Sequence, residues 1–144
     1  WENYPDRKTA AFVDVYTSTV SEQFEMYPMP QETGYKTDTR WLHLTDEAGN
    51  GWFVEGEDLL GFSALHFTPE DLTKADRGLW HTVDLQPRNE VILNVDHRMM
   101  GVGGDNSWGA RPHARYSIIP DDYSYRFRIR AFRSGQRPTE QFGF

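Results

Sequence analysis

The strongest constraint on the fold is the segment from Tyr123 to Ala131, in which apolar and basic side chains alternate. Its odd positions carry Tyr123, Tyr125, Phe127 and Ile129, and three of its even positions carry Arg126, Arg128 and Arg130. Successive side chains of a β-strand point to opposite faces, so the apolar row and the arginines fall on different faces. The segment is therefore predicted to be a half-buried strand of an antiparallel sheet.

Shorter alternating runs predict further strands along the chain. They are residues 11–16, with Ala11, Val13 and Val15 on one face; 39–44; 52–54, after an Asn50-Gly51 hairpin turn; 60–67; and 90–97, with Val91, Leu93 and Val95 on one side. A helix is indicated only after Thr68, which can cap a short segment that starts at Pro69 and ends near Ala75. Many short strands between turn signals predict an all-β fold, an antiparallel β-sandwich.

Length and composition narrow the class of protein. The 144 residues suffice for one domain with a sizeable core, and an aromatic content of 15% argues against disorder. A net charge of −7 disfavours nucleic acid as a partner, and no apolar run reaches the ~18 residues of a membrane span. Without cysteine, disulfides are excluded and the compartment cannot be read from them. The missing initiator Met indicates a piece of a longer protein, with a domain over residues 1–132 and a polar tail over 133–144.

A glycine-rich loop at residues 101–113 carries the most unusual arrangement of side chains. Its four glycines and one proline favour an irregular loop whose backbone a ligand can approach closely. Trp108 lies in the middle, between a serine and a glycine. Two interpretations remain open: the indole is a platform for a flat, partly apolar ligand such as a sugar, or it fills a gap over the fold. Asp105 and Asn106 are expected to fix the loop by bonding to its backbone.

No catalytic or metal-binding pattern stands out among the titratable residues. With 22 acidic residues in the chain, the pairs Asp121-Asp122 and Glu55-Glu57 are interpreted as parts of a turn and a loop. The five histidines lack metal-ligand spacing and are interpreted as ordinary strand or loop residues. The arginines from 126 to 133 are interpreted as a solvated strand face, or one paired with acidic neighbours.

Three compositionally unusual motifs occur in a fixed order. They are Glu2-Asn-Tyr-Pro-Asp-Arg7, the run Leu60-Gly-Phe-Ser-Ala-Leu-His-Phe-Thr-Pro-Glu-Asp-Leu72, and Gly101-Val-Gly-Gly-Asp-Asn-Ser-Trp-Gly109. Together they resemble the C-terminal part of large β-galactosidases of the LacZ type, in glycoside hydrolase family 2. The resemblance covers roughly residues 2–132. In the first motif, Asp6 and Arg7 are expected to hold one another or a neighbouring domain.

The resemblance implies a fold and an activity for the parent protein. The fold would be the C-terminal half of a galactose mutarotase-like supersandwich, and such a half can expose strand edges and an apolar face. The parent reaction would be retaining hydrolysis of terminal β-galactosides through a galactosyl-enzyme intermediate. In the family the two catalytic glutamates lie in a separate upstream barrel. We therefore expect no catalytic residue in this chain, which alone should be inactive.

The resemblance also implies a binding residue and partners. Trp108 would stack on the aglycone, the leaving sugar, with Gly103, Gly104, Asp105, Asn106 and Ser107 as the supporting loop. The parent enzyme would need magnesium and often a monovalent cation such as sodium, but no ligand set for them is recognisable here. The expected partners are the β-galactoside or its aglycone sugar and the remaining domains of a homo-oligomeric parent, not nucleic acid or a membrane.

Other functions remain open at this point. A free-standing carbohydrate-binding module also uses tryptophan on a β-sandwich, and it would bind sugar as an isolated chain. A purely structural or interaction domain would make Trp108 irrelevant to activity. An aldose epimerase is suggested by fold analogy alone, without a convergent His/Glu site.

Overall fold

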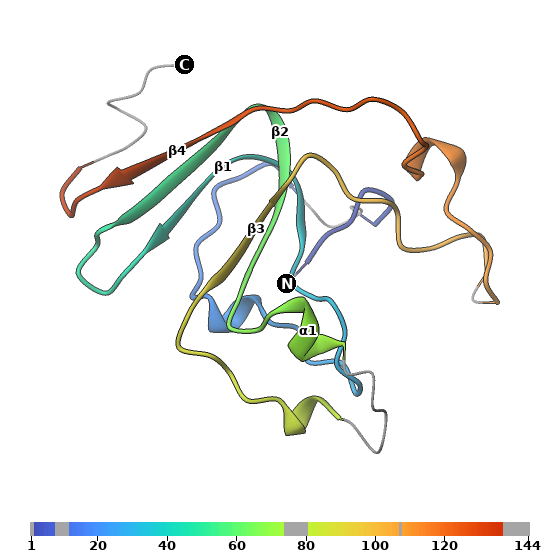
Figure 1. Cartoon of the computed structure of the whole chain (residues 1–144), viewed down its shortest axis with the longest axis horizontal. Helices are drawn as coiled ribbons and strands as arrows, with labels where there is room; N and C mark the ends of the chain where they lie inside the picture. The colour runs from blue at the N-terminus through green and yellow to red at the C-terminus, as the bar shows by residue number, and fades with distance from the viewer. Residues whose placement is uncertain (1, 8–11, 74–80, 107, 137–144) are drawn as a thin grey trace.

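The computed structural model describes residues 2–7, 12–73, 81–106 and 108–136. These residues form one four-stranded antiparallel sheet, built from β1 (Lys36–Thr45), β2 (Gly51–Leu65), β3 (Ile92–Asp96) and β4 (Phe127–Phe132). The helical elements are short: α1 (Pro69–Leu72) and three 3-10 turns at Ser21–Gln23, Thr82–Asp84 and Ala114–Tyr116. The predicted mostly β, antiparallel architecture is confirmed (Figure 1).

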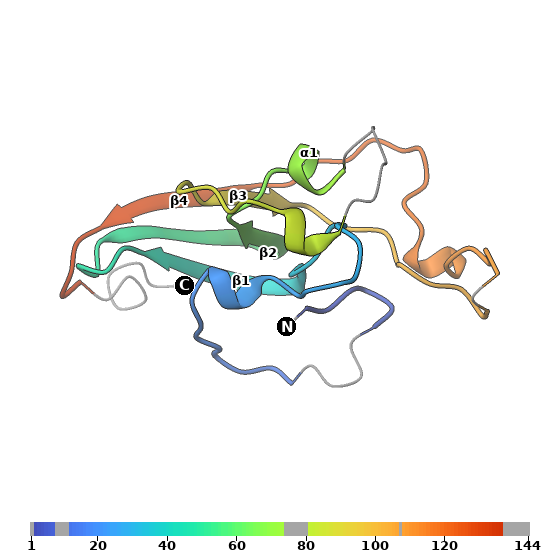
Figure 2. The same ribbon diagram turned by 90° about the horizontal axis from the view of Figure 1, so that it is seen from below.

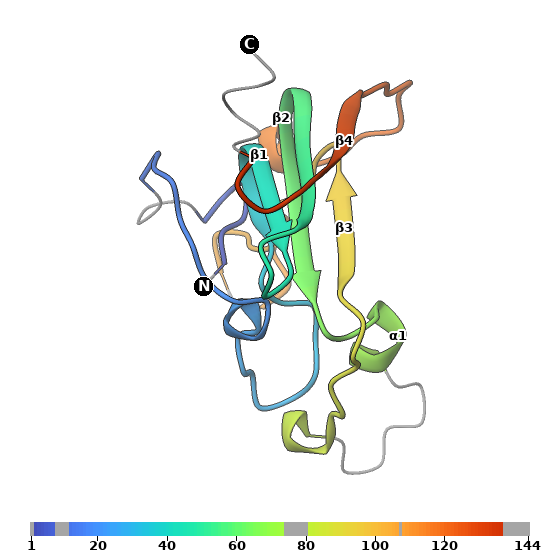
Figure 3. The ribbon, with the colours of Figure 1, turned by 90° about the vertical axis from the view of Figure 1, so that its left-hand side faces the viewer.

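The long strand β2 organises the sheet. One of its edges pairs with β1, and the other edge is divided between two strands. On that divided edge β4 pairs with residues 51–56 and β3 pairs with residues 61–65, so β3 and β4 lie end to end (Figure 3). Every strand of the sheet therefore depends on β2 for its backbone partners.

The hairpin between β1 and β2 is fixed by a turn at residues 46–50. Asp46 N–H donates to the Asn50 carbonyl at 2.8 Å, and Asp46 Oδ1 accepts from Asn50 N–H at 2.8 Å. Gly49 adopts a φ of 81°, a left-handed conformation that glycine reaches without a Cβ penalty. The predicted hairpin is confirmed, but its turn is centred on Gly49, and Gly51 is already the first residue of β2.

The core divides between the two faces of the sheet. On one face a buried cluster is covered by partly buried neighbours; its members are Leu42, Val54 and Leu60, with Leu44, Phe62, Leu93 and Val95 packed against them. On the opposite face the buried ring of Phe53 lies 5.0 Å from the ring of His43 and 6.2 Å from that of Trp41, between centroids. A second cluster joins the end of β2 to α1 and contains Leu65, Phe67, Leu72 and Leu85.

The alternating segment 123–131 forms β4 over its second half. Ile129 is paired with Val54 across the strands, and the pairing is antiparallel as predicted. The burial of its apolar row was wrongly predicted for this chain, because the exposed fractions of Tyr123, Tyr125, Phe127 and Ile129 are 42%, 43%, 41% and 49%. Burying this row requires a second layer, and the described residues form a single sheet. The open apolar face was itself an expectation for a half-sandwich.

Two other local predictions need correction. Residues 12–16 form no strand, and Phe12, Val13 and Val15 are largely exposed, since this run has no partner strand in the described structure; Ala11 lies outside the described residues. The short helix is confirmed in position but ends at Leu72, and its N-terminus is closed by a capping box between Thr68 and Asp71. Residues 90–97 do contain β3, and Leu93 and Val95 pack on the predicted side.

A buried lysine at the start of β1 makes the stability pH-dependent. Lys36 donates from Nζ to the Gly34 carbonyl at 2.7 Å and is 7% exposed. Burial lowers the pKa of Lys36 to about 8, although the charges of Glu2 and Glu25 oppose the shift. The unfolded chain therefore binds more protons than the folded chain between that value and the ordinary lysine pKa, so stability rises with pH in this window.

We expect the free energy of unfolding to gain roughly 1–2 kcal/mol from Lys36 between about pH 8 and pH 9.5. In the Lys36→Met variant this rise should be absent. Urea titrations of both proteins at several pH values measure it. The window stops below pH 10 because the raised pKa values of Tyr4, Tyr27 and Tyr35 make stability fall above it. Parallel pH profiles for the two proteins would contradict the prediction.

Candidate functional site

The N-terminal motif is pinned to the start of β1. The Glu2 carboxylate accepts from Gly34 N–H at 2.8 Å and from Thr33 Oγ1 at 3.2 Å, and it also accepts from the Tyr27 hydroxyl. Although burial opposes the shift, these hydrogen bonds hold the pKa of Glu2 below its ordinary value. In Figure 2 this N-terminal segment runs along the β1 side of the sheet. Residues 2–7 therefore have a fixed position relative to the strands.

The neighbouring residues add two backbone contacts and a ring contact. Asn3 donates from its N–H to the Tyr35 carbonyl at 2.8 Å, and its Oδ1 accepts from Thr37 N–H at 2.6 Å. The ring of Tyr4 stacks on that of Tyr35 with 6.0 Å between centroids. The motif ends in a tight turn, in which Arg7 N–H donates to the Tyr4 carbonyl at 2.9 Å.

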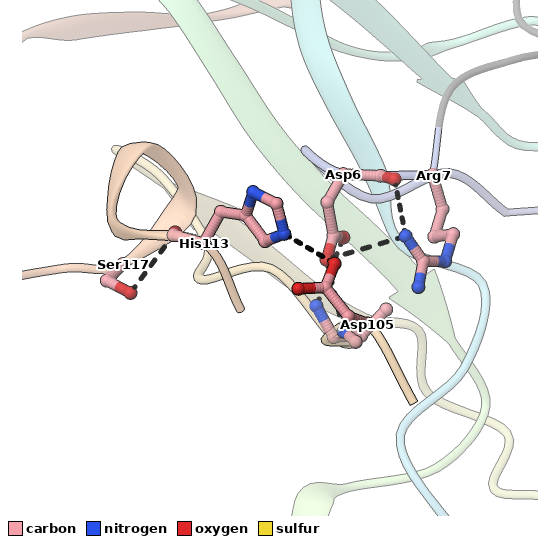
Figure 4. Close-up of polar contacts among 7 residues, drawn as sticks. Asp6, Arg7, Asp105, His113 and Ser117 are labelled. Atoms are coloured by element: carbon pink, nitrogen blue, oxygen red, sulfur yellow. Dashed lines mark hydrogen bonds and ion pairs between the residues drawn. The ribbon is translucent and has the colours of Figure 1, made fainter. Parts of the chain in front are cut away.

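Asp6 connects this motif to the glycine-rich loop. Its two carboxylate oxygens accept the N–H groups of Val102 and Gly103, both at 3.1 Å. Burial opposes ionisation, but these two hydrogen bonds and the nearby Arg7 hold the pKa of Asp6 below its ordinary value. Arg7 itself lies against Asp6, with its Nη1 donating to the Asp6 carbonyl at 2.9 Å (Figure 4). The two residues therefore hold one another, as expected, and also hold a loop of their own chain.

Three of the four glycines of the loop lie in close contact with other atoms. A Cβ at Gly101 would lie 2.6 Å from Asp6 Oδ2, and a Cβ at Gly103 would lie 2.3 Å from Arg7 Nη2. A Cβ at Gly104 would lie 2.3 Å from the carbonyl oxygen of Ala110. Real Cβ atoms do not sit at such distances. A larger residue at Gly101 would therefore push against the Asp6 carboxylate and one at Gly104 against the backbone of Ala110, whereas the exposed Arg7 side chain can move away from Gly103.

The outer part of the loop is braced by its own side chains. His113 Nε2 lies 2.6 Å from Asp105 Oδ1, an exposed pair that ties the two arms of the loop together (Figure 4). Asn106 Oδ1 accepts from Trp108 N–H at 2.8 Å and from Ala110 N–H at 3.4 Å. The predicted bonding of Asn106 to nearby backbone is present, whereas Asp105 bonds instead to a histidine. Ser107 lies outside the described residues.

Trp108 projects from this braced loop into solvent. Its exposed fraction is 91%, the largest among the exposed apolar residues of the described structure. An indole with that exposure fills no gap over this sheet. The side chain instead points away from the sheet and is accessible to a ligand or to a neighbouring domain. Its role in binding sugar stays a prediction.

The acidic pairs considered from the sequence have structural partners. Glu55 is 6% exposed and lies in β2 rather than in a loop, with Oε1 2.8 Å from Arg128 Nη1. Glu57 also lies in β2, with Oε2 2.8 Å from Arg126 Nε. Asp121 accepts the N–H of Asp122 at 2.9 Å, which is turn chemistry. The arginine face is thus paired with acidic neighbours, one of the two interpretations left open.

Sequence reasoning missed another pair of acids. Burial raises the pKa of Asp96, and burial together with the nearby charge of Asp96 raises the pKa of Glu32. The sequence contains no local pattern that predicts the proximity of Glu32 and Asp96, because the two residues are more than sixty positions apart.

The histidines take up packing and hydrogen-bonding positions. His97 stacks on Tyr125 with 5.3 Å between ring centroids, and His66 Nδ1 lies 3.2 Å from the Glu90 carbonyl. No group of three or more His, Asp or Glu residues among the described ones is arranged to hold a metal ion. None of the helices among the described residues has the length and apolarity needed to cross a membrane.

Comparison with known proteins supports the resemblance seen in the motifs. Residues 1–129 match the family model for the β-galactosidase small chain. The chain is 36% identical over 130 residues to a β-galactosidase of Priestia megaterium, an alignment that covers 90% of this chain and 12% of that protein. It is 36% identical over 129 residues to a β-galactosidase of Vibrio cholerae, covering 90% and 12%. For a β-galactosidase of Lactobacillus delbrueckii subsp. bulgaricus the identity is 34% over 117 residues, covering 81% and 11%.

The matched residues include the N-terminal motif at residues 2–7, the strands β1, β2 and β3, and the glycine-rich loop at residues 101–113. The chain spans only 11–12% of the length of these three relatives. It is homologous to part of the LacZ-type β-galactosidases and belongs to the β-galactosidase small chain family.

Proposed function

We propose that this chain is the C-terminal sandwich region of a β-galactosidase and supplies Trp108 to the aglycone side of the active site. The observation that carries the proposal is the 91% exposure of Trp108 on a loop that is anchored by Asp6 and held in shape by its own internal hydrogen bonds. A tryptophan presented in this way stacks on the apolar C–H face of a sugar, which removes that surface from water. The relatives named above are β-galactosidases, which supplies the substrate class.

The chemistry of the proposed reaction is divided between this chain and the remainder of the enzyme. Retaining glycoside hydrolysis needs two carboxylates, one as nucleophile and one as acid and then base. Neither role is assigned to a residue of this chain. Trp108 would bind and orient the leaving sugar, and later an acceptor sugar, while the galactosyl group is held elsewhere. Magnesium and sodium are likewise proposed for the remainder of the enzyme.

The open apolar face supports the finer fold proposal. Exposed aromatic and aliphatic side chains form a continuous row along β4 and the residues before it. Contiguous apolar patches of this kind are typical of interfaces. We propose that a second sheet of the parent β-galactosidase covers this face and completes a galactose mutarotase-like supersandwich. The surrounding parts of the enzyme would then be the partners of this chain.

The isolated chain is expected to hydrolyse no β-galactoside, because neither catalytic carboxylate is assigned to it. The purified chain would be assayed with a chromogenic galactoside, beside the assembled enzyme as a positive control. Turnover that survives repurification and is abolished by Glu32→Gln or Asp96→Asn would contradict this division of roles.

A titration of the isolated chain separates the proposal from its main alternative. A free-standing carbohydrate-binding module should bind galactose, glucose or lactose by itself, and calorimetry would detect it. Under the present proposal, Trp108 supplies only one wall of a site, so the isolated chain should show no measurable heat of binding at millimolar sugar. A clear affinity that disappears in the Trp108→Ala variant would favour the module.

A further inference from the structure

We propose that Asp6 is the positioning residue for Trp108, acting through the backbone of Val102 and Gly103. The proposal rests on the proposed role of Trp108 at the aglycone side. It extends that role to a residue more than ninety positions earlier in the chain.

The first argument is the contact itself. The Asp6 side chain is 3% exposed, so its carboxylate is buried between its own motif and the loop. It accepts two consecutive backbone N–H groups, one on each oxygen. Hydrogen bonds to a charged carboxylate are stronger than hydrogen bonds between neutral groups. Two such bonds fix both the position and the direction of the loop backbone at Val102 and Gly103.

The second argument is that the residues next to Asp6 are held against the sheet. Asn3 bonds to the backbone of β1 and of the residue before it, and Tyr4 stacks on the buried ring of Tyr35. Asp6 lies within the tight turn from Tyr4 to Arg7, which follows directly on Asn3. The sheet therefore sets the position of Asp6, and Asp6 sets the position of the loop.

The third argument is the path from Gly103 to Trp108. Gly101 N–H donates to the Tyr116 carbonyl at 2.8 Å and closes the base of the loop. Beyond Gly103 the bonds between Asp105 and His113, and between Asn106 and Trp108 N–H, are internal to the loop. Internal bonds preserve the shape of the loop but do not orient it relative to the sheet. That orientation depends on the anchors at its base, of which Asp6 contributes two hydrogen bonds.

The test is a double-mutant cycle in the assembled β-galactosidase. Asp6→Asn keeps the size of the side chain but replaces one acceptor oxygen by an NH₂ group, which would face a backbone N–H. We expect the inhibition constants of ligands that reach the aglycone side to rise about three- to tenfold. Galactose-only inhibitors should change less than about twofold. In the Trp108→Ala background, Asp6→Asn should cause no further loss, because coupled residues are not additive.

A matched control uses another aspartate that holds a turn. Asp46 accepts Asn50 N–H at 2.8 Å in the β1–β2 turn, which lies at the opposite end of the sheet from the loop in Figure 1. Asp46→Asn should leave both classes of inhibition constant unchanged. Hydrogen–deuterium exchange supplies a second readout: the peptide over residues 101–110 should exchange faster in Asp6→Asn and not in Asp46→Asn.

The outcomes separate the inference from the function on which it rests. If Trp108→Ala weakens aglycone-side ligands but Asp6→Asn changes neither those constants nor the exchange of the loop, the inference is overturned and the function stands. If Asp6→Asn accelerates exchange of the loop while Trp108→Ala changes no constant, the anchoring is supported and the proposed function of Trp108 fails. Full additivity of the two substitutions, or equal weakening of galactose-only inhibitors, would show that Asp6 supports the fold generally and would overturn the inference.

Discussion

Replacing Trp108 with alanine in the assembled β-galactosidase is expected to weaken ligands that fill the aglycone side about five- to thirtyfold. The physical reason is the loss of a flat apolar surface, worth roughly 1–2 kcal/mol when a sugar face covers it. Because Trp108 is 91% exposed in this chain, its removal creates no cavity in the sheet and should leave the melting temperature unchanged. Galactose-only inhibitors should lose little affinity, since they need not reach the loop.

The measurement is a set of inhibition constants for galactose-like and aglycone-like ligands in the wild type and in variants. Trp108→Phe and Trp108→Tyr should recover part of the affinity, because each restores an aromatic face. Trp52→Ala is the matched control, since Trp52 is another exposed tryptophan, at 52%, but lies on β2. Transfer of galactose to glucose should fall relative to transfer to water in Trp108→Ala. Equal weakening of both ligand classes, or a melting temperature lower by many degrees, would show that Trp108 has a packing role.

Gly61→Ala is expected to destabilise the sheet strongly. A Cβ at Gly61 would lie 1.7 Å from the Tyr35 hydroxyl oxygen and 2.4 Å from its ring carbon. Tyr35 is 1% exposed and its ring is stacked on Tyr4, so it has no space into which to move. Overpacking in a well-packed core costs about 1–3 kcal/mol, so we expect the melting temperature to fall by up to roughly 10 °C.

Tyr35→Phe supplies the control for this prediction. The Tyr35 hydroxyl is buried and has no hydrogen-bond partner among the described residues. Its removal alone should therefore leave stability unchanged or slightly raised. Combined with Gly61→Ala, it should recover part of the lost stability, because the nearest atom is gone. Thermal unfolding of the four proteins measures the effect, and an unchanged melting temperature for Gly61→Ala would contradict the packing described here.

The period-two pattern predicted strands correctly where a partner strand exists. Residues 90–97 and 123–131 both contain strands, and Leu93 packs on the predicted side. The same pattern at residues 12–16 was misleading, because alternation describes a strand's faces and says nothing about what pairs with its edges. For Ile129 the strand was right and the burial was wrong, since burial requires a second layer and the described residues form a single sheet.

The candidate site was predictable in its local part only. The glycines and the short polar residues of the loop were recognised from their types, and Asn106 bonds to the backbone as such residues do. The contact between Asp6 and Gly103 was not predicted, because it joins segments far apart in the sequence and leaves no periodic signal. One sequence feature could have suggested the contact. An Asp-Arg pair occurs in one motif and closely spaced glycines occur in another, and glycines allow a side chain to approach the backbone closely.

The divided edge of β2 has a consequence for the order in which the chain acquires its structure. β1 and β2 are joined by a short turn and form a local hairpin, whereas Gly56 finds its partner Phe127 more than seventy residues later. Closing so long a loop is entropically slow, so non-local pairing of this kind limits the rate of folding. During synthesis residues 51–56 of β2 keep one edge unpaired until β4 has emerged. That edge is a template for intermolecular pairing, and it is protected only once residues 127–132 have paired with it.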